Sequence, residues 1–248
     1  MSAFLVNRSV LHYETVGRGK PVIFLHNFIG SWRYWIPVMD VLSAGFKCYA
    51  YDLWGYGDSA KDPAMFSLES HVNQLQQFME QLGIQQAALV GHGYGALVAQ
   101  YFASRYPLQV SRMVSIHHHI PTVLRKDQTQ FQTHTWLSSQ HLPEAVALDC
   151  QKAAPGAVVS AFASLIEASD RTDDSDAEKT MPHLVIQYGE HSGTASKSGR
   201  VVISKQTFFP MAQNPEELNR LLHEFLAGTP IALAEGVSVK EFWKRRVR

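Results

Sequence analysis

Three glycines spaced two residues apart mark the part of the chain whose arrangement best suits chemistry. Gly91, Gly93 and Gly95 follow the apolar run 88–90, and the helical pattern 96–100 comes next. Small residues at positions 91 and 95 let a strand and a helix pass close together, as in a nucleophile elbow. The residue at the centre of such a turn attacks the substrate. Here that residue is Gly93, which has no side chain for attack on a carbonyl carbon.

Four other motifs occur in order around this turn. They are the loop 26–30 (His-Asn-Phe-Ile-Gly), the loop 52–59 (Asp-Leu-Trp-Gly-Tyr-Gly-Asp-Ser), the segment 188–191 (Tyr-Gly-Glu-His) and the segment 209–217, which begins with Phe-Pro. Together with the elbow they resemble the α/β-hydrolase family, and the resemblance covers nearly the whole chain. In that family the first loop reads His-Gly and lines an oxyanion hole, and the second reads Asp-x-x-Gly-x-Gly-x-Ser. The third lies at the end of the strand that precedes the catalytic acid, and the fourth follows the catalytic histidine.

The resemblance implies where a catalytic triad would lie, and this chain departs from it at each position. In the family the elbow reads Gly-x-Ser-x-Gly, the acid stands two residues beyond the position of Glu190, and the histidine directly precedes the Phe-Pro pair. These positions hold Gly93, Ser192 and Phe208. Because triad residues act as a unit, the loss of all three favours a lineage that abandoned hydrolysis over one engineered substitution. We therefore expect ordinary serine hydrolase activity to be absent.

The backbone around the elbow is expected to keep an oxyanion hole. The N–H groups of Asn27 or Phe28, together with that of Tyr94 at a helix N-terminus, could bind an anion or a carbonyl oxygen. In a hydrolase without its triad, such a hole and substrate binding alone leave about 10³ to 10⁴ of catalysis over water. The remaining site could serve binding or a different reaction.

Aromatic and apolar side chains beside these loops predict the lining of a pocket for a small apolar molecule. The candidates are Phe28, Trp32, Tyr94, Trp136, Phe208 and Met211. The alternative is that Phe208 and its neighbours fill the space that the triad left, which would give a solid core without a ligand site. The sequence leaves both possibilities open.

Several histidines could act as a residual general base, namely His92, His117, His119 and His191. Alternation along a strand puts His117 and His119 on one face, where two imidazoles could contribute to a metal site. The sequence assigns no third ligand, so ordinary hydrogen-bonded histidines are favoured and no metal is predicted. The resemblance implies structural roles for His26 and His92.

A phosphate-binding dinucleotide loop is a competing interpretation of the glycine pattern. Its third glycine would fall at Ala96, and an acidic residue should follow about 20 residues later to hold a ribose. The segment 112–120 contains no Asp or Glu. We therefore discard this interpretation and predict no cofactor.

Strand signals place the motifs within a sheet. Two short alternating runs at 4–7 and 10–14 predict an antiparallel hairpin. Continuous apolar runs, typical of strands buried in a parallel sheet, follow at 21–26, 47–52, 87–91, 110–117 and 183–188. Helical patterns lie between several of these runs, and strand-helix-strand alternation predicts a sheet covered on both faces.

Two helices have clear limits. The first begins after Ser67, has one apolar stripe and ends at Gly83. The second has Asn214 as N-cap and Pro215 at its first position, and it ends at Gly228. Its predicted buried face is Leu218, Leu221, Leu222, Phe225 and Leu226. The expected fold class is α/β: an α/β-hydrolase fold with a mostly parallel central sheet, an N-terminal antiparallel hairpin, helices on both faces and a short helical lid.

The predicted domain organisation has one core with an insertion and a tail. Residues 1–119 and 177–236 form the core, and 120–176 form a helical lid, because helical pieces there replace the strand pattern. Residues 237–248 form a basic C-terminal tail with Lys240, Lys244, Arg245, Arg246 and Arg248 against Glu241 alone. A solvated helix end is the favoured interpretation of the tail. The alternative is docking to an anionic partner, with Phe242 and Trp243 as apolar anchors.

Composition narrows the class of protein. The chain has 248 residues, with 22 Lys and Arg against 22 Asp and Glu, which argues against a nucleic-acid-binding surface spread over the molecule. Two cysteines, Cys48 and Cys150, make no disulfide framework and favour a reducing compartment. No secretory signal follows Met1, and no apolar run reaches the length of about 18 residues that a membrane span needs. We expect a soluble, cytoplasmic protein, and the sequence does not determine its oligomeric state.

Three functional hypotheses follow. The main one is a non-hydrolytic pseudoenzyme that binds a small apolar molecule or a protein partner. The alternative is an enzyme that does not use a serine: a lyase or cofactor-independent oxygenase acting through a histidine, or an atypical hydrolase that uses the oxyanion hole and pocket histidines. The third is an interaction module that docks through its basic tail. None of them involves nucleic acid or a membrane span.

Overall fold

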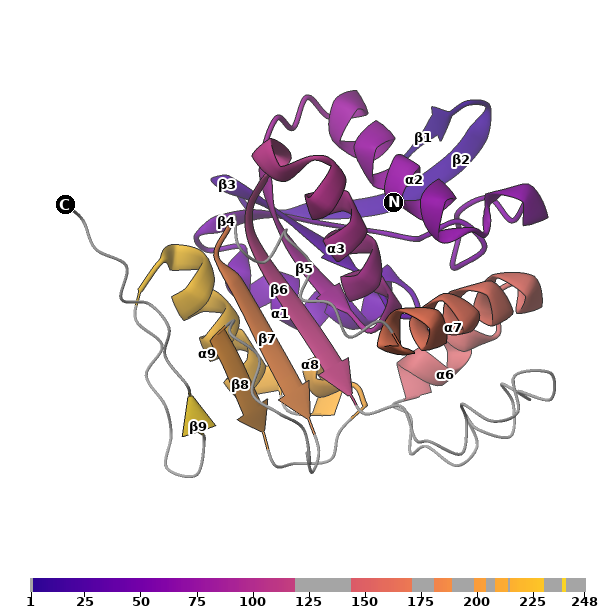
Figure 1. The fold of residues 1–248 in the computed structure, drawn as a ribbon. Coiled ribbons are helices and arrows are strands. Elements are labelled where there is room, and N and C mark those ends of the chain that lie inside the picture. The colour runs from indigo at the N-terminus through magenta and orange to yellow at the C-terminus, as the bar shows by residue number, and fades with distance from the viewer. Residues whose placement is uncertain are drawn as a thin grey trace.

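The computed structural model describes residues 2–118, 144–170, 181–188, 199–203, 208–213, 215–229 and 238–239. Its described strands form one nine-stranded sheet in the order β1-β2-β4-β3-β5-β6-β7-β8-β9 (Figure 1). The strands are β1 (Ser2–Val6), β2 (Ser9–Val16), β3 (Lys20–Leu25), β4 (Phe46–Tyr51), β5 (Ala87–His92), β6 (Val110–His118), β7 (His183–Tyr188), β8 (Gly199–Ile203) and β9 (Ser238–Val239).

The centre of the sheet is parallel and its two edges are antiparallel. Parallel pairing joins β4, β3, β5, β6, β7 and β8 in turn, whereas β1–β2, β2–β4 and β8–β9 pair antiparallel. The N-terminal hairpin turns at Asn7 and Arg8, whose φ angles of 49° and 70° are positive. The predicted fold class is confirmed. Sequence reasoning did not predict β8, and β9 lies within the segment predicted as a basic tail.

Helices cover both faces of the sheet. α2 (Leu68–Gln81) and α3 (Tyr94–Arg105) lie on one face, and α1 (Ile36–Leu42), α8 (Pro210–Gln213) and α9 (Pro215–Ala227) lie on the other (Figure 1). α6 (Glu144–Cys150) and α7 (Pro155–Asp170) lie near the C-terminal ends of β5 and β6. Short 3-10 turns occur at Trp32–Trp35, Pro63–Met65 and Pro107–Gln109.

The two helices with clear sequence limits form as predicted. α2 begins after Ser67, whose Oγ accepts a hydrogen bond from the N–H of Ser70 at 3.1 Å and so caps the helix. Gly83, with a φ of 65°, follows its end. α9 buries the five apolar residues of its predicted face together with Asn219. Asn214, the predicted N-cap, lies outside the described residues.

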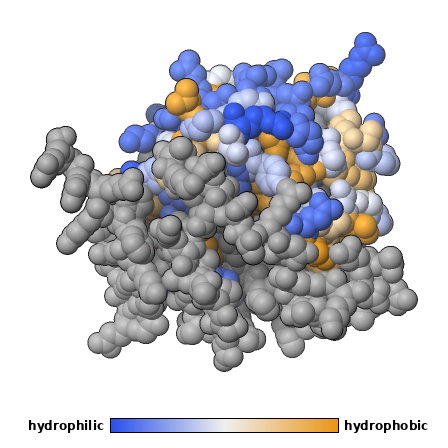
Figure 2. Space-filling model, in the orientation of Figure 1, coloured by the Kyte–Doolittle hydropathy of each residue, from blue (hydrophilic) through white to orange (hydrophobic). Residues whose placement is uncertain are grey.

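Apolar side chains from both faces make one continuous core, with Trp35, Tyr51, Tyr56, Tyr94 and Phe24 among its largest fully buried members. Figure 2 shows a mainly hydrophilic upper edge on this side of the molecule, with smaller hydrophobic areas between. Among the described helices, none is both long enough and apolar enough to cross a membrane.

Candidate functional site

The elbow between β5 and α3 has a backbone that only glycine adopts without strain. Gly93 has φ 51° and ψ −112°, and its N–H donates to the carbonyl of Ile116 at 2.9 Å. A Cβ added to Gly93 would lie 2.2 Å from Oδ1 of Asn27. A Cβ on Gly95 would lie 2.3 Å from the carbonyl oxygen of Leu25, so the predicted close passage of strand and helix is confirmed.

The side chain of Asn27 occupies the space beside Gly93. Its Oδ1 accepts hydrogen bonds from the backbone N–H of Phe28 at 2.8 Å and from that of Tyr94 at 2.9 Å. The backbone N–H of Asn27 itself donates to the hydroxyl of Tyr34 at 2.6 Å. Of the backbone donors singled out in the sequence, those of Phe28 and Tyr94 therefore converge, and the point where they converge holds an amide oxygen.

His26 fixes the loop that carries Asn27. Its Nδ1–H donates to the carbonyl of Asn27 at 2.7 Å, and its Nε2 accepts from the N–H of Leu53 at 2.9 Å. Complete burial lowers the pKa of His26, although the charges of Asp52 and Asp149 oppose the shift. A neutral imidazole suits this arrangement, because one ring nitrogen must accept while the other donates.

Tyr94 is held from the opposite side by α2. The Tyr94 hydroxyl lies 2.8 Å from Nδ1 of His71, and Nε2 of His71 lies 3.0 Å from the carbonyl of Trp54. A carbonyl only accepts, so Nε2 carries the proton and the Tyr94 hydroxyl donates to Nδ1. Burial lowers the pKa of His71 to about 4, and burial raises the pKa of Tyr94. Both groups are thus neutral near pH 7.

Aromatic rings surround the base of the elbow on the other face. His92 is buried, its Nδ1 lies 3.2 Å from the Tyr34 hydroxyl, and its ring centroid lies 6.0 Å from that of Phe208. Phe208 and Phe209 pack on each other at 5.0 Å, and Met211 on α8 is fully buried. The ring of Trp32 instead lies beside His12, at 5.8 Å.

The loop at 52–59 closes around a buried carboxylate. Asp52 accepts hydrogen bonds from the N–H groups of Trp32 and Asp58 at 3.1 and 3.0 Å, and His12 Nδ1 lies 3.0 Å away. Burial opposes ionisation, but the hydrogen bond from His12 and these N–H groups outweigh it and lower the pKa of Asp52. Ser59 Oγ donates to the Asp52 carbonyl at 2.8 Å.

His12, Asp52 and Asp58 bring three possible metal-ligand atoms within 4.8 Å of one another. Asp58, however, forms ion pairs with Lys152 at 3.1 Å and with Arg33 at 3.4 Å, and its pKa is lowered because these cations outweigh its partial burial. The Asp52 oxygens already accept the hydrogen bonds described above. We therefore assign this cluster to bracing the loop.

The other residues singled out in the sequence are placed only in part. His117 lies in β6 opposite Gln187 of β7. His119, Trp136, His191 and Ser192 lie outside the described residues. Sequence reasoning missed the Asn27 side chain, Tyr34 and His71. The available signal was Asn27 itself, because it stands where the resembled His-Gly loop has its glycine.

Residues 20–157 match a family model described as alpha/beta hydrolase fold. The chain belongs to this family. Among curated proteins it is similar to "Epoxide hydrolase 2" of Siraitia grosvenorii, with 38% identity over 44% of this chain and 35% of that protein. It is also similar to "Soluble epoxide hydrolase" of Corynebacterium sp. (strain C12), with 34% identity over 40% of this chain and 35% of that protein. The matched part thus spans about a third of the length of these relatives.

A solved structure supports the same architecture. The epoxide hydrolase CorEH, solved without ligand, superposes with a TM-score of 0.71 at 19% identity, covering 92% of this chain and 98% of CorEH. Similarity at this level of identity shows the fold.

The relatives overturn one hypothesis drawn from the sequence. We expected a non-hydrolytic pseudoenzyme, whereas the similar curated proteins are named as hydrolases. The main functional hypothesis was therefore wrong. We had inferred the loss of hydrolysis from the missing side chain at Gly93. A glycine removes covalent attack through that position only, and water can still be the attacking group.

Proposed function

We propose that this chain is an atypical hydrolase that adds water to a small apolar electrophile, with an epoxide as the substrate class. The observation that carries the proposal is the convergence of the Phe28 and Tyr94 N–H groups, at 2.8 and 2.9 Å, on one point beside the elbow. That point holds Oδ1 of Asn27, so these donors act on a substrate oxygen through the Asn27 amide, whose fixed dipole stabilises negative charge that develops there. The epoxide class rests on the names of the relatives in the preceding section.

The proposed reaction proceeds without a covalent enzyme intermediate. Water attacks a ring carbon, the bond from that carbon to the ring oxygen breaks, and the ring oxygen takes up a proton while the attacking water loses one, giving a diol. Gly93 has no group with which to form an ester, and Ser192 and Phe208 cannot supply the acid and histidine of a triad. Direct attack by water needs none of these three groups.

His92 is the general base in this proposal. Its side chain is buried beside Phe208, which stands at the position of the family's histidine, and its Nδ1 lies within hydrogen-bond distance of Tyr34. A base at this position would take a proton from water on the side of the site where the family's catalytic histidine stands. His117, His119 and His191 are the other candidates that the sequence offers.

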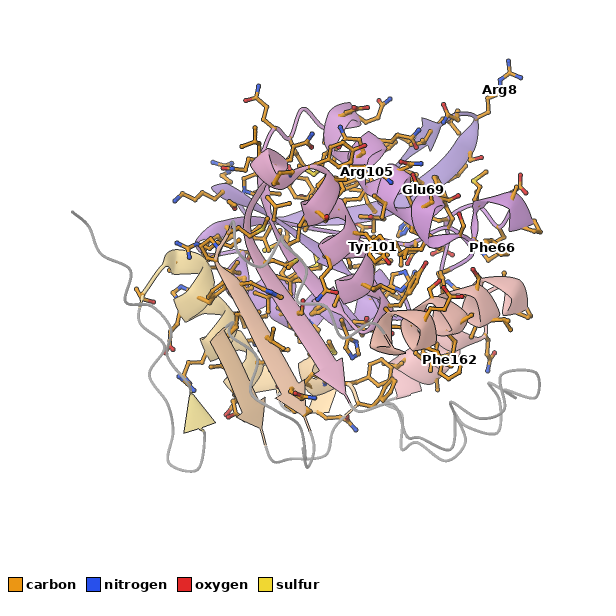
Figure 3. All side chains as sticks on the ribbon, in the orientation of Figure 1. Arg8, Phe66, Glu69, Tyr101, Arg105 and Phe162 are labelled. Atoms are coloured by element: carbon orange, nitrogen blue, oxygen red, sulfur yellow. The ribbon has the colours of Figure 1, made fainter. Side chains whose placement is uncertain are left out.

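The segment 120–176 is proposed as the lid of this site, between core segments 1–119 and 177–236. Phe162 extends from α7, and its ring lies 5.5 Å from that of Phe28 (Figure 3). An aromatic contact at this point supports an apolar lining next to the paired donors. Trp136 and Met211 remain proposed members of that lining, and 237–248 a proposed basic tail.

The test is the hydration of styrene oxide by the purified chain in ¹⁸O-labelled water, with enzyme in excess for a single turnover. We expect diol that carries the label from the first turnover, because water attacks directly. His92→Gln should lower the rate about 10²-fold, the usual contribution of a general base. His223→Gln, on the exposed side of α9, should not change it.

Two outcomes would contradict the proposal. Diol formation no faster than in buffer would rule out the activity. Unlabelled diol in the first turnover would mean that an enzyme carboxylate, and not water, attacks the ring.

A further inference from the structure

The carboxamide of Asn27 is fully buried and almost completely satisfied. Its Oδ1 accepts from the N–H groups of Phe28 and Tyr94. In the backbone of the same residue, the N–H donates to Tyr34 and the carbonyl accepts from His26. The exception is Nδ2, which has no hydrogen-bond partner among the described residues. A buried N–H that lacks an acceptor costs about 1–3 kcal/mol, so its retention calls for a reason.

The position of Nδ2 points to that reason. A Cβ built on Gly93 would lie 2.6 Å from Nδ2 and 2.4 Å from Cγ of Asn27. The nearest Asn27 atom is Oδ1 at 2.2 Å, so the whole carboxamide, Nδ2 included, lies where a side chain on the elbow would begin. That is the place from which the central residue of a nucleophile elbow reaches its substrate.

We propose that Asn27 is the catalytic residue that binds the substrate's oxygen through Nδ2 and thereby selects epoxides over esters. The inference rests on the proposed function and names the group that makes the contact. Two N–H donors on Oδ1 polarise the amide, and chains of hydrogen bonds strengthen one another, so Nδ2 becomes a better donor. Through the amide, the two backbone donors thus help to stabilise negative charge on the substrate's oxygen.

The same arrangement excludes the chemistry of esters. The tetrahedral intermediate of ester cleavage needs its oxyanion at the point where the two backbone donors converge. The Asn27 Oδ1 already occupies that point. An epoxide oxygen needs only one good donor as its bond to carbon breaks, and Nδ2 supplies it.

The experiment compares two variants of Asn27 on two probes, styrene oxide and p-nitrophenyl acetate. Asn27→Asp keeps an oxygen for both backbone donors but replaces the Nδ2 donor with an acceptor. We expect kcat for styrene oxide to fall about 10²-fold, the usual effect of losing one such donor. Asn27→Gly empties the point of convergence. It should likewise lose epoxide hydration and gain measurable cleavage of p-nitrophenyl acetate, as expected for an open oxyanion hole.

Asn219→Asp is the matched control, because Asn219 is also a buried asparagine but lies on α9. It should leave both rates unchanged, and the thermal midpoints of all three variants establish that they fold. A shift of substrate preference in Asn27→Gly is a readout that loss of packing alone would not produce.

The outcomes separate the two proposals. Wild-type protein that forms no diol would overturn the proposed function and this inference with it. Wild-type protein that forms diol while Asn27→Asp retains its kcat would overturn the role of Asn27 alone. So would an Asn27→Asp variant whose first-turnover diol is unlabelled in ¹⁸O-water, because its carboxylate would then be the attacking group.

Discussion

At the scale of single residues, the elbow lacks a side chain at Gly93, and the side chain of Asn27 lies in that space. Gly93 contributes no Cβ, and the carboxamide of Asn27 fills the volume that a Cβ would need. The two positions are 66 residues apart in number, but a hydrogen bond connects Asn27 to the N–H of Tyr94, the residue after Gly93. Neither residue can be replaced without regard to the other.

Gly93→Ala should therefore destabilise the protein for two separate reasons. The backbone of Gly93, with φ 51° and ψ −112°, lies in a sparsely populated region that costs a residue with a Cβ about 1–3 kcal/mol. The overlap with Asn27 Oδ1, at 2.2 Å, should add about 1–3 kcal/mol of overpacking. Urea denaturation gives the free energy of unfolding for each variant.

Gly83→Ala is the control for a positive φ without the overlap. Gly83 also has a positive φ, 65°, but a Cβ there would meet no described atom within 4 Å. Asn27→Gly combined with Gly93→Ala should recover the overlap energy in a double-mutant cycle. If Gly93→Ala cost no more than Gly83→Ala, the Asn27 side chain would not fill the space that we assign to it.

At the scale of elements, side chains join α2 and α3 both at the surface and in the interior. On the surface, Arg105 of α3 and Glu69 of α2 form an exposed ion pair, and Figure 3 shows the two side chains next to each other. In the interior, His71 of α2 bonds to Tyr94 at the first position of α3. The buried bond has the stronger influence on the site, because an exposed pair is screened by solvent whereas Tyr94 directly follows Gly93.

The burial of His71 predicts a stability that falls on acidification. His71 has a pKa of about 4 in the folded protein against an ordinary value of 6.5. Between these pH values the unfolded chain binds the proton and the folded protein does not. The free energy of unfolding therefore falls as the pH drops from about 6.5 to about 4, by up to about 1.4 kcal/mol per pH unit for one such group.

His71→Gln should reduce this slope. Part of it should remain, because burial also lowers the pKa of His26. Urea denaturation of both proteins at a series of pH values measures the two slopes. Parallel curves for wild type and His71→Gln would show that His71 does not titrate in this window.

Residues and elements also differ in how far the sequence alone could predict them. Strands β3 to β7 and helices α2 and α9 follow from apolar runs and periodic stripes, because each of these elements buries one continuous surface. β8 and β9 were missed because they are short strands at one end of the sheet, and their pairing depends on a distant partner, as with Val201 and Val239. The backbone donors of the site were predictable from motif positions. The occupant of their meeting point was not, since it depends on the direction of one side chain.

At the scale of the whole molecule, α6 and α7 contact the core at the end where the elbow lies (Figure 1). The N–H of Ala154 donates to the carbonyl of Gly55 at 2.7 Å, and a Cβ on Gly55 would lie 2.4 Å from Cβ of Ala157. Phe162 of α7 packs on Phe28, the residue that supplies one of the two backbone donors. The closeness of α7 to the loop at Gly55 thus determines how firmly the helix packs on the core beside Phe28.

Ala157→Leu should loosen α6 and α7 from the core without unfolding it. Ala157 is fully buried against the loop, and extra methylene groups in such a contact cost about 1–3 kcal/mol. We expect faster hydrogen exchange in 144–170 and unchanged exchange in α9, because local opening needs only the contacts of the displaced segment to break. Val159→Leu adds volume on the same helix at a side chain that is 52% exposed, so it should leave exchange in 144–170 as in wild type. Equal protection of 144–170 in Ala157→Leu and wild type would mean that α7 is held by other contacts. A rise in exchange throughout the sheet would mean that the segment and the core unfold as one unit.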